Sequence, residues 1–201
     1  MWITWTHDDA GLSWPLPFEK KVELFYEQAL GWQLHIADLV ANGGVAFGEQ
    51  GQRDGQAAVA IRHSGFAVLQ ICLSYFETIG RYAGARGGSK AAFEAGVRRV
   101  FPELATQDPV GVQGFVDSLY HGARCGLYHN TRTAKVGLGW PPENVAIFYE
   151  HGTGRMIMNP ERLPKVLKAH LEAYRGELLD PTNQTLRELF ERQFDQDSGA
   201  V

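Results

Sequence analysis

Apolar residues recur along this chain with the period of an α-helix over most of its length. From Phe18 to Val40 they alternate in steps of four and three residues, and Asn42-Gly43-Gly44 follows. This pattern predicts one long amphipathic helix with a glycine stop. Further helices are predicted from about Ala57 or Phe66 to Tyr82, from Ser89 to about Pro102, through Phe115 to Ala123, over 161–179 and over 185–194. The sequence therefore indicates a mainly α protein, a four- to five-helix up-and-down bundle.

The hydrophobic pattern changes before the last long helix. Short runs rich in β-branched and aromatic residues lie near 145–150 and 155–158, separated by the turn-forming residues His151-Gly152-Thr153-Gly154. Such runs around a tight turn are typical of a β-hairpin. We therefore expect a small β-hairpin within region 136–158, appended to the bundle.

The remaining segments are predicted to be irregular. Residues 1–16 contain three tryptophans among turn formers, and 43–57 is rich in Gly and Gln, so it is predicted to be a loop. The stretch 84–89 is predicted to be a turn, with Ser89 as the N-cap of the next helix. Residues 195–201 are predicted to be a flexible tail. A chain of 201 residues is expected to form a single domain, 1–201.

Composition places the chain among globular proteins and predicts a cytoplasmic location. It is 44% hydrophobic and 21% charged, with a formal net charge of -4, so nucleic-acid binding would have to be local. Cys72 and Cys125 lack the spacing of a metal site and are expected to be reduced thiols. The N-terminus has no apolar signal region, and no apolar run is long enough to cross a bilayer. We expect no membrane association.

One stretch combines basic and imidazole side chains without nearby acids in the sequence. Between Ser118 and Pro142 there is no Asp or Glu, which predicts an electropositive surface that favours an anionic ligand such as a phosphodiester. Its chemically capable residues are Tyr120, His121, Arg124, Tyr128, His129, Asn130, Arg132 and Lys135.

Arg124 and His129 are the candidate catalytic residues. Side chains five positions apart on an ideal helix point about 140° away from each other. They can converge if the helix breaks at Gly126, or if two copies of the helix meet across a two-fold axis. A structural arginine and a surface histidine are the equal alternative.

The neighbouring residues are candidates for supporting roles. His121 and Tyr128 lie three before and four after Arg124, hence on its face of a helix. His121 could orient a phosphate, Tyr128 or Tyr120 could stack on a base, and Arg132 could contact RNA. Ordinary packing and capping are the favoured alternative. Asn130 either orients His129 or caps the helix.

A second basic stretch precedes this region. Residues 80–100 contain Arg81, Arg86, Lys90, Arg98 and Arg99 against a single acidic residue, Glu94. A solvated face is the favoured interpretation, and an extended RNA groove is the alternative.

The histidines do not have the spacing of a metal site. His121 and His129 are too far apart along a helix, roughly 12 Å, to share one ion. No metal site and no cofactor are expected.

The segment LYHGARCGLYHNTRT, together with helices of the SYFETIGRYA kind, a following hairpin and MNPERL, resembles the HEPN superfamily (higher eukaryotes and prokaryotes nucleotide-binding). The resemblance covers roughly 18–180 and is most specific at 120–132. The family's Arg-x4-6-His motif falls on Arg124 and His129. The family often has a polar residue directly after the arginine, where this chain has Cys125.

The resemblance implies an all-α metal-independent ribonuclease that acts as a homodimer. Two motif copies would form one composite site, in a toxin–antitoxin or antiviral defence setting with an antitoxin or defence-system partner protein. A histidine can take or give a proton near neutral pH, and a guanidinium can hold phosphate oxygens. The alternatives are a non-catalytic HEPN-like module that binds nucleic acid or protein, and a helical adaptor with a coincidental motif.

Overall fold

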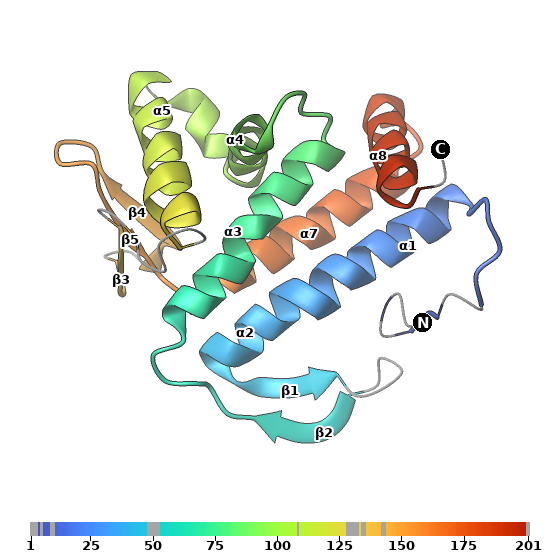
Figure 1. Ribbon diagram of the computed structural model, residues 1–201, viewed down its shortest axis with the longest axis horizontal. Helices are drawn as coiled ribbons and strands as arrows, with labels where there is room; N and C mark the ends of the chain where they lie inside the picture. Colours follow the sequence, from blue (N-terminus) through green and yellow to red (C-terminus); the bar gives the residue numbers. More distant parts are fainter. Residues whose placement is uncertain are drawn as a thin grey trace.

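The computed structural model describes residues 4, 6–8, 11–47, 53–107, 109–127, 133, 136–141 and 144–199. This part of the chain is mainly helical and carries two small β-sheets that lie apart from one another (Figure 1). The long helices α1, α3 and α7 pack together, and the two sheets lie at the edges of this helical layer.

The first helical rod corresponds to the helix predicted from Phe18 onward. It consists of α1 (Phe18–Ala29), the π-helical segment η2 (Leu30–Leu34) and α2 (His35–Asn42), which follow one another without a break. Pro17 lies at its N-cap, where a missing N–H costs nothing. Gly43 ends it with a φ of 70°, a conformation that residues with a Cβ rarely adopt.

Helices α3 (Gly65–Tyr82) and α4 (Ser89–Val100) cross at a contact between their backbones. A Cβ added to Gly80 would lie 1.8 Å from the carbonyl oxygen of Ala92. A Cβ added to Gly96 would lie equally close, 1.8 Å, to the carbonyl oxygen of Phe76. The two glycines therefore set how closely α3 and α4 approach each other.

The cap of α4 differs from the prediction by one residue. Gly88, in an extended conformation, is the N-cap, and Ser89 is the first residue of the helix. The Ser89 hydroxyl lies near Arg81 of α3 instead of satisfying the start of its own helix. The side chain of Ser89, which the sequence pattern predicts to cap α4, thus contacts another helix instead.

A second interrupted helix carries Arg124, the first residue of the Arg-x4-His motif. The 3-10 segment η4 (Pro102–Thr106) leads to α5 (Pro109–Asp117), which continues as the π-helical segment η5 (Ser118–Cys125). The hydrogen bonds of a π-helix run from residue i to i+5, so its turns are wider than those of the predicted α-helix. The buried side chains of this rod include Val112, Phe115, Val116, Leu119 and Ala123.

The C-terminal helices are α7 (Leu163–Leu179) and α8 (Gln184–Asp197). The tail predicted over 195–201 is helical as far as Asp197, which corrects that prediction. Lys21 of α1 explains the difference, because its buried ammonium group lies 2.6 Å from a Glu191 oxygen and 2.8 Å from an Asp195 oxygen. These ion pairs tie the last turns of α8 to α1.

The segment 43–57, predicted to be a loop, contains most of a β-hairpin. Strands β1 (Gly44–Phe47) and β2 (Arg53–Ala58) pair antiparallel, with Gly44 opposite Ala58. The sequence lacks the alternation of apolar and polar residues by which a strand is recognised. The pairing of β1 with β2 instead depends on the close approach of the two backbones at Gly43, where a Cβ would lie 2.7 Å from the carbonyl oxygen of Ala58.

The second sheet holds the strands predicted near 145–150 and 155–158. Strands β4 (Ile147–Glu150) and β5 (Arg155–Met158) pair antiparallel. A third strand, β3 (Val136–Leu138), lies on the other side of β5 and pairs with it in parallel, so the strand order is β3-β5-β4. Region 136–158 therefore holds a three-stranded sheet and not only the predicted hairpin. The sequence pattern did not predict β3, because three residues are too few to show the alternation of a strand.

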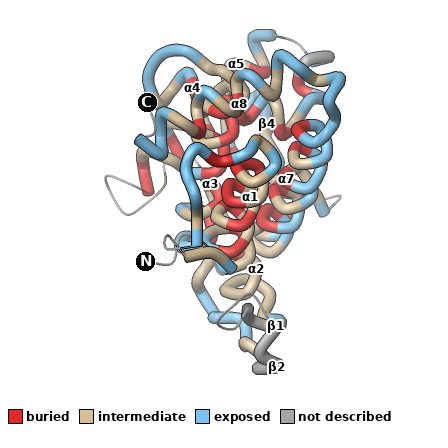
Figure 2. Tube along the Cα trace, turned by 90° about the vertical axis from the view of Figure 1, so that its right-hand side faces the viewer, coloured by how far each residue is buried: buried red, intermediate tan, exposed pale blue. Residues whose placement is uncertain are grey.

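The core lies between the helices and is rich in aromatic side chains. Figure 2 shows buried positions along the inner sides of α1, α3 and α7. Tyr75, Phe76, Phe93, Tyr174 and Phe190 are each less than 2% exposed. None of the described helices combines the length and apolar character that crossing a bilayer requires.

Candidate functional site

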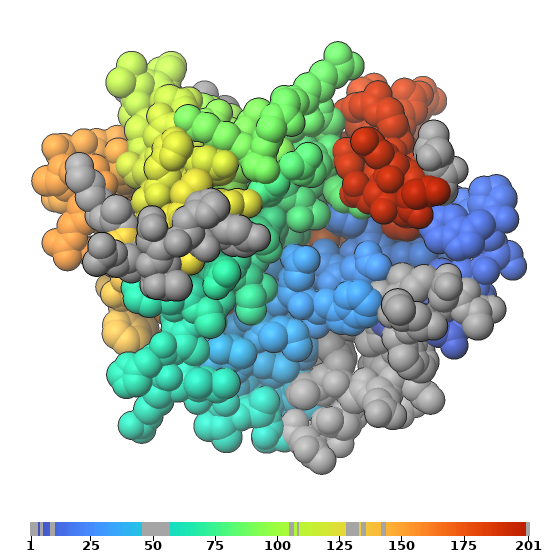
Figure 3. All heavy atoms as spheres, in the orientation of Figure 1, coloured from blue at the N-terminus to red at the C-terminus, as the bar shows by residue number. Residues whose placement is uncertain are grey.

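Of the predicted site residues, the structure describes Tyr120, His121 and Arg124. His129, Tyr128, Asn130 and Arg132 lie outside the described residues. The pairing of Arg124 with His129 therefore stays a prediction. The described half of the motif lies in η5, whose surface adjoins those of α3 and α4 (Figure 3).

The π-helical geometry of η5 determines which side chain accompanies Arg124. The Arg124 guanidinium lies 6.0 Å from the centre of the Tyr120 ring, four residues earlier. His121 is exposed, and its ring contacts the Tyr120 ring edge-on at 5.0 Å. The structure thus brings Tyr120 next to Arg124, with His121 on the outer side of the tyrosine.

Tyr120 also packs against the core. Its ring meets the Phe93 ring at 5.3 Å with an interplanar angle of 65°. Burial raises the pKa of Tyr120, and the neighbouring Cys125 raises it further, against the opposing charge of Arg124. The phenol therefore keeps its proton at neutral pH and is suited to hydrogen bonding rather than to acting as a base. Tyr120 was predicted either to stack on a base or to pack within the protein, and its contact with Phe93 is a packing contact.

A carboxylate from another helix meets the motif arginine. Arg124 donates a hydrogen bond from Nη2 to Oε2 of Glu77 on α3, over 3.0 Å. The Nη2 of Arg81, one turn further along α3, donates to Oε1 of the same carboxylate over 2.9 Å. The Ser89 hydroxyl lies 3.5 Å from the same Arg81 nitrogen. Two guanidinium groups from two helices therefore converge on one carboxylate.

The cluster keeps Glu77 ionised. Burial raises the pKa of the Glu77 carboxyl, but hydrogen bonds from Arg81, Ser89 and Arg124 and the charge of Arg124 outweigh burial, so the pKa lies below its ordinary value of 4.5. The Glu77 side chain is 17% exposed and that of Arg124 is 23% exposed, so solvent reaches both. At neutral pH the three side chains carry a net charge of about +1.

A second ion pair faces the same region. Lys90 of α4 lies 2.9 Å from an oxygen of Asp117, the last residue of α5. The hydrogen bond from Lys90 lowers the pKa of Asp117 against the effect of burial, and His121 contributes to the lowering. The absence of acids between 118 and 142 in the sequence is therefore misleading. In the folded chain, Glu77 and Asp117 supply negative charge at the surface expected to be positive.

The second basic stretch is largely neutralised by ion pairs. Arg81 pairs with Glu77, Lys90 with Asp117, and Arg99 with Glu177 of α7. Three of the five cations expected to form a solvated face or an RNA groove thus have a carboxylate partner. This arrangement agrees better with a salt-bridged face than with an uninterrupted RNA groove.

Sequence reasoning did not assign Glu77 or Ser89 to the site. Glu77 is the acidic residue of α3 and stands next to buried Phe76, which is a weak signal of a tertiary partner. No spacing rule links it to Arg124, 47 residues later. Arg81 was recognised only as a member of a basic stretch.

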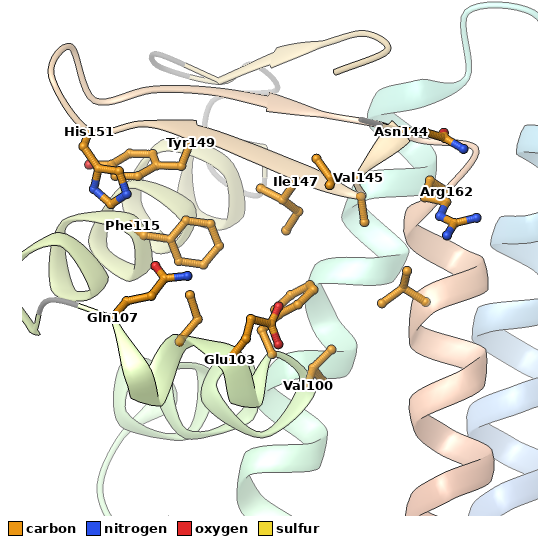
Figure 4. Close-up of a pocket in the computed structure, with 14 residues that line it drawn as sticks. Val100, Glu103, Gln107, Phe115, Asn144, Val145, Ile147, Tyr149, His151 and Arg162 are labelled. Atoms are coloured by element: carbon orange, nitrogen blue, oxygen red, sulfur yellow. The ribbon is translucent and has the colours of Figure 1, made fainter. Parts of the chain in front are cut away.

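A hollow of the described surface lies away from the motif, between η4, α5, β4 and α7 (Figure 4). This cavity of about 540 Å³ has Leu104 and Phe115 in its floor. Gln107 and His151 lie at one end and Arg162 at the other. Arg124 is not among its lining residues, so this hollow and the described motif residue occupy different places.

Within the described ranges, no three side chains of His, Cys, Asp or Glu converge where they could hold a metal ion. Cys72 and Cys125 are free thiols, and Cys72 is buried. Burial raises the pKa of the Cys72 thiol, which makes it unreactive at neutral pH.

Comparison with known proteins adds no relative. No family model, curated protein or solved structure matches the chain.

Proposed function

We propose that this protein is a metal-independent endoribonuclease of the HEPN type, with Arg124 and His129 as its catalytic residues. The observation that carries the proposal is the setting of Arg124. It lies near the end of a π-helical segment, a feature found often at functional sites, and its guanidinium is partly exposed beside a second arginine. Two neighbouring guanidinium groups that are partly exposed are suited to binding a phosphodiester.

The proposed reaction uses the RNA itself as the nucleophile. The ribose 2′-hydroxyl attacks the adjacent phosphorus, and the bond from phosphorus to the 5′-oxygen of the next nucleotide breaks. One group must take the 2′ proton and another must give a proton to the 5′-oxygen. His129 is suited to either task because an ordinary histidine titrates near neutral pH. Arg124 would stabilise the additional negative charge on the phosphorane oxygens.

Each chain contributes one motif histidine, whereas the reaction needs an acid and a base. A homodimer would supply both from two copies of His129 facing one strand of RNA. The proposal therefore includes a dimer, and with it the up-and-down bundle of four or five helices typical of the HEPN superfamily. It also includes a toxin–antitoxin or antiviral role in the cytoplasm, with a partner protein that restrains cleavage.

The test is RNA cleavage by the His129→Ala variant. We expect the cleavage rate to fall by at least about 100-fold, the usual contribution of a general acid or base. His151→Ala is the matched control, because His151 is exposed and lies on the turn between β4 and β5. Its rate should stay within twofold of the native rate, and EDTA should change neither. Full cleavage by His129→Ala, or cleavage that requires Mg²⁺, would refute the proposal.

A non-catalytic nucleic-acid-binding module is the second candidate. The contact between Arg124 and Glu77 favours it, since an arginine engaged by a carboxylate can serve structure alone. One measurement distinguishes the two candidates, namely the length of the RNA after incubation with the protein. A binding module leaves the bound RNA uncleaved, whereas a ribonuclease shortens it.

A further inference from the structure

The cluster around Glu77 has the donor arrangement of an anion-binding site. Arg81 and Arg124 approach opposite oxygens of one carboxylate, Oε1 at 2.9 Å and Oε2 at 3.0 Å. The Ser89 hydroxyl adds a third donor from the first turn of α4. These groups come from α3, η5 and α4, so the fold, and not a local sequence motif, brings them together.

A phosphodiester presents the same acceptors to these donors as a carboxylate does. Both offer two terminal oxygens that share one negative charge, and guanidinium groups bind either through paired N–H donors. The side chains of Arg81, Arg124 and Glu77 are 40%, 23% and 17% exposed, so the cluster opens to solvent. An anion from solution can therefore reach it without unfolding the helices.

We propose that Glu77 occupies the place of an RNA phosphate, and that Arg81 and Ser89 hold this phosphate together with Arg124 once the Glu77 side chain turns away. This inference rests on the proposed function, because it assigns the phosphate contacts of the same site. Arg81 is then a phosphate-binding residue, and Glu77 is an internal competitor that masks the site in the absence of RNA.

The competition has a simple electrostatic basis. With Glu77 in place the two guanidinium charges are half neutralised, and an incoming phosphate must displace a carboxylate that already has its hydrogen bonds. Glu77→Gln keeps the shape of the side chain and removes its charge. The arginines then lack their internal anion, and a phosphate gains the full attraction of both.

The experiment measures binding of a 2′-O-methyl oligonucleotide, which lacks the attacking hydroxyl and is not cleaved. Fluorescence anisotropy gives its Kd for the native protein, Glu77→Gln and Arg81→Gln at several salt concentrations. We expect Glu77→Gln to bind at least tenfold more tightly. Arg81→Gln should bind about tenfold more weakly, with a salt dependence smaller by about one phosphate contact.

Glu177→Gln is the matched control for net charge. Glu177 is ion-paired to Arg99 on α4, so this variant removes the same charge from another carboxylate–arginine pair. Its affinity should remain within twofold of the native affinity. An equal gain in Glu177→Gln and Glu77→Gln would overturn the proposal, since net charge alone would then explain it. Unchanged or weaker binding by Glu77→Gln would overturn it too, as would native binding by Arg81→Gln.

A structural role for Glu77 is distinguished by the same set of variants. If Glu77 only anchors η5 to α3, Glu77→Gln lowers the melting temperature without a gain in affinity. Because the Arg81 side chain is 40% exposed, we expect Arg81→Gln to fold, so it tests phosphate contact even if Glu77→Gln folds poorly. Inorganic pyrophosphate is the second probe, because it requires no recognition of a base or sugar. It should raise the melting temperature of Glu77→Gln more than that of the native protein.

The outcome separates this inference from the nuclease proposal. Loss of cleavage in His129→Ala together with unchanged affinity in Glu77→Gln would leave the nuclease standing and remove the masked phosphate site. Tighter binding by Glu77→Gln together with full cleavage by His129→Ala would support the masked phosphate site and remove His129 as the catalytic residue.

Discussion

Arg124 is positioned by a residue that precedes it by 47 positions, and this contact changes what its motif can do. A guanidinium in water is a general anion binder, whereas one hydrogen-bonded to Glu77 is oriented and partly neutralised. The pKa of Glu77 is held below its ordinary value by the same hydrogen bonds, against the effect of burial. Each member of the pair therefore sets the state of the other, and neither can be interpreted alone.

His170 is a second residue whose surroundings decide its chemistry. Its Nδ1 lies 2.8 Å from the hydroxyl of buried Tyr75. Burial, with a contribution from the charge of Arg99, lowers the pKa of His170 from 6.5 to about 4. Burial also raises the pKa of Tyr75, so the tyrosine keeps its proton and donates a hydrogen bond to the neutral imidazole.

This lowered pKa predicts acid sensitivity. Between pH 6.5 and about 4 the unfolded chain protonates His170 and the folded chain does not, so stability is full above pH 6.5 and falls as the pH drops. The loss should reach on the order of 2–3 kcal/mol near pH 4. Urea unfolding across this range should show a shallower pH dependence for His170→Gln. Tyr75→Phe keeps the imidazole buried and should retain the native slope, and an identical slope in His170→Gln would contradict the assignment.

At the scale of elements, the crossing of α3 and α4 depends on glycine. A substituent on Gly80 or Gly96 would overlap a carbonyl oxygen of the facing helix, so only hydrogen fits at either position. The contact keeps Arg81 of α3 near Ser89 of α4, and Tyr120 of η5 against Phe93. The helix crossing therefore supports the geometry of the candidate site.

The crossing can be tested with Gly80→Ala. The added methyl group forces the helices apart, and overpacking of this kind typically costs about 1–3 kcal/mol, partly offset by the better helix propensity of alanine. We expect a net loss of at least about 1 kcal/mol in urea unfolding. Gly176→Ala in α7 is the control, because no atom lies within 4 Å of its added Cβ. That variant should gain up to about 1 kcal/mol, and a gain in both variants would show that the crossing is looser than the geometry implies.

At the scale of the whole molecule, the proposed reaction needs more than one chain. The described surface of one chain presents Arg124, His121 and Tyr120, but an acid and a base at one phosphate require two copies of His129 under the proposal. The formal net charge of -4 adds a second constraint, since under the proposal RNA is attracted to a local surface of an acidic protein.

Dimerisation predicts a dependence on protein concentration. If the site is shared between two chains, the cleavage rate per chain should fall as the protein is diluted through the range where light scattering reports dissociation. A rate per chain that stays constant while the protein becomes monomeric would exclude a shared site. Glu177→Gln, which leaves the motif intact, should follow the native curve.

The helical part of the fold could be predicted because it is encoded locally. The four-and-three spacing from Phe18 and the apolar faces of α3, α4 and α7 are properties of adjacent turns, so the sequence pattern suffices. The hairpin β1–β2 could not be predicted, since it depends on the close approach that Gly43 permits rather than on alternation. The parallel partner of β5 was missed because three residues show no period.

By itself, the sequence determined the mainly helical class of this protein and the motif residues Arg124 and His129 as candidates, because residue type and spacing are enough for both. Only the tertiary structure decided that Arg124 meets Glu77 and Arg81, and that Tyr120 contacts Phe93. The physical reason is that charge and hydrogen bonding act through space. An acid far away in sequence can lie 3.0 Å from a motif arginine, and no pattern along the chain records that distance.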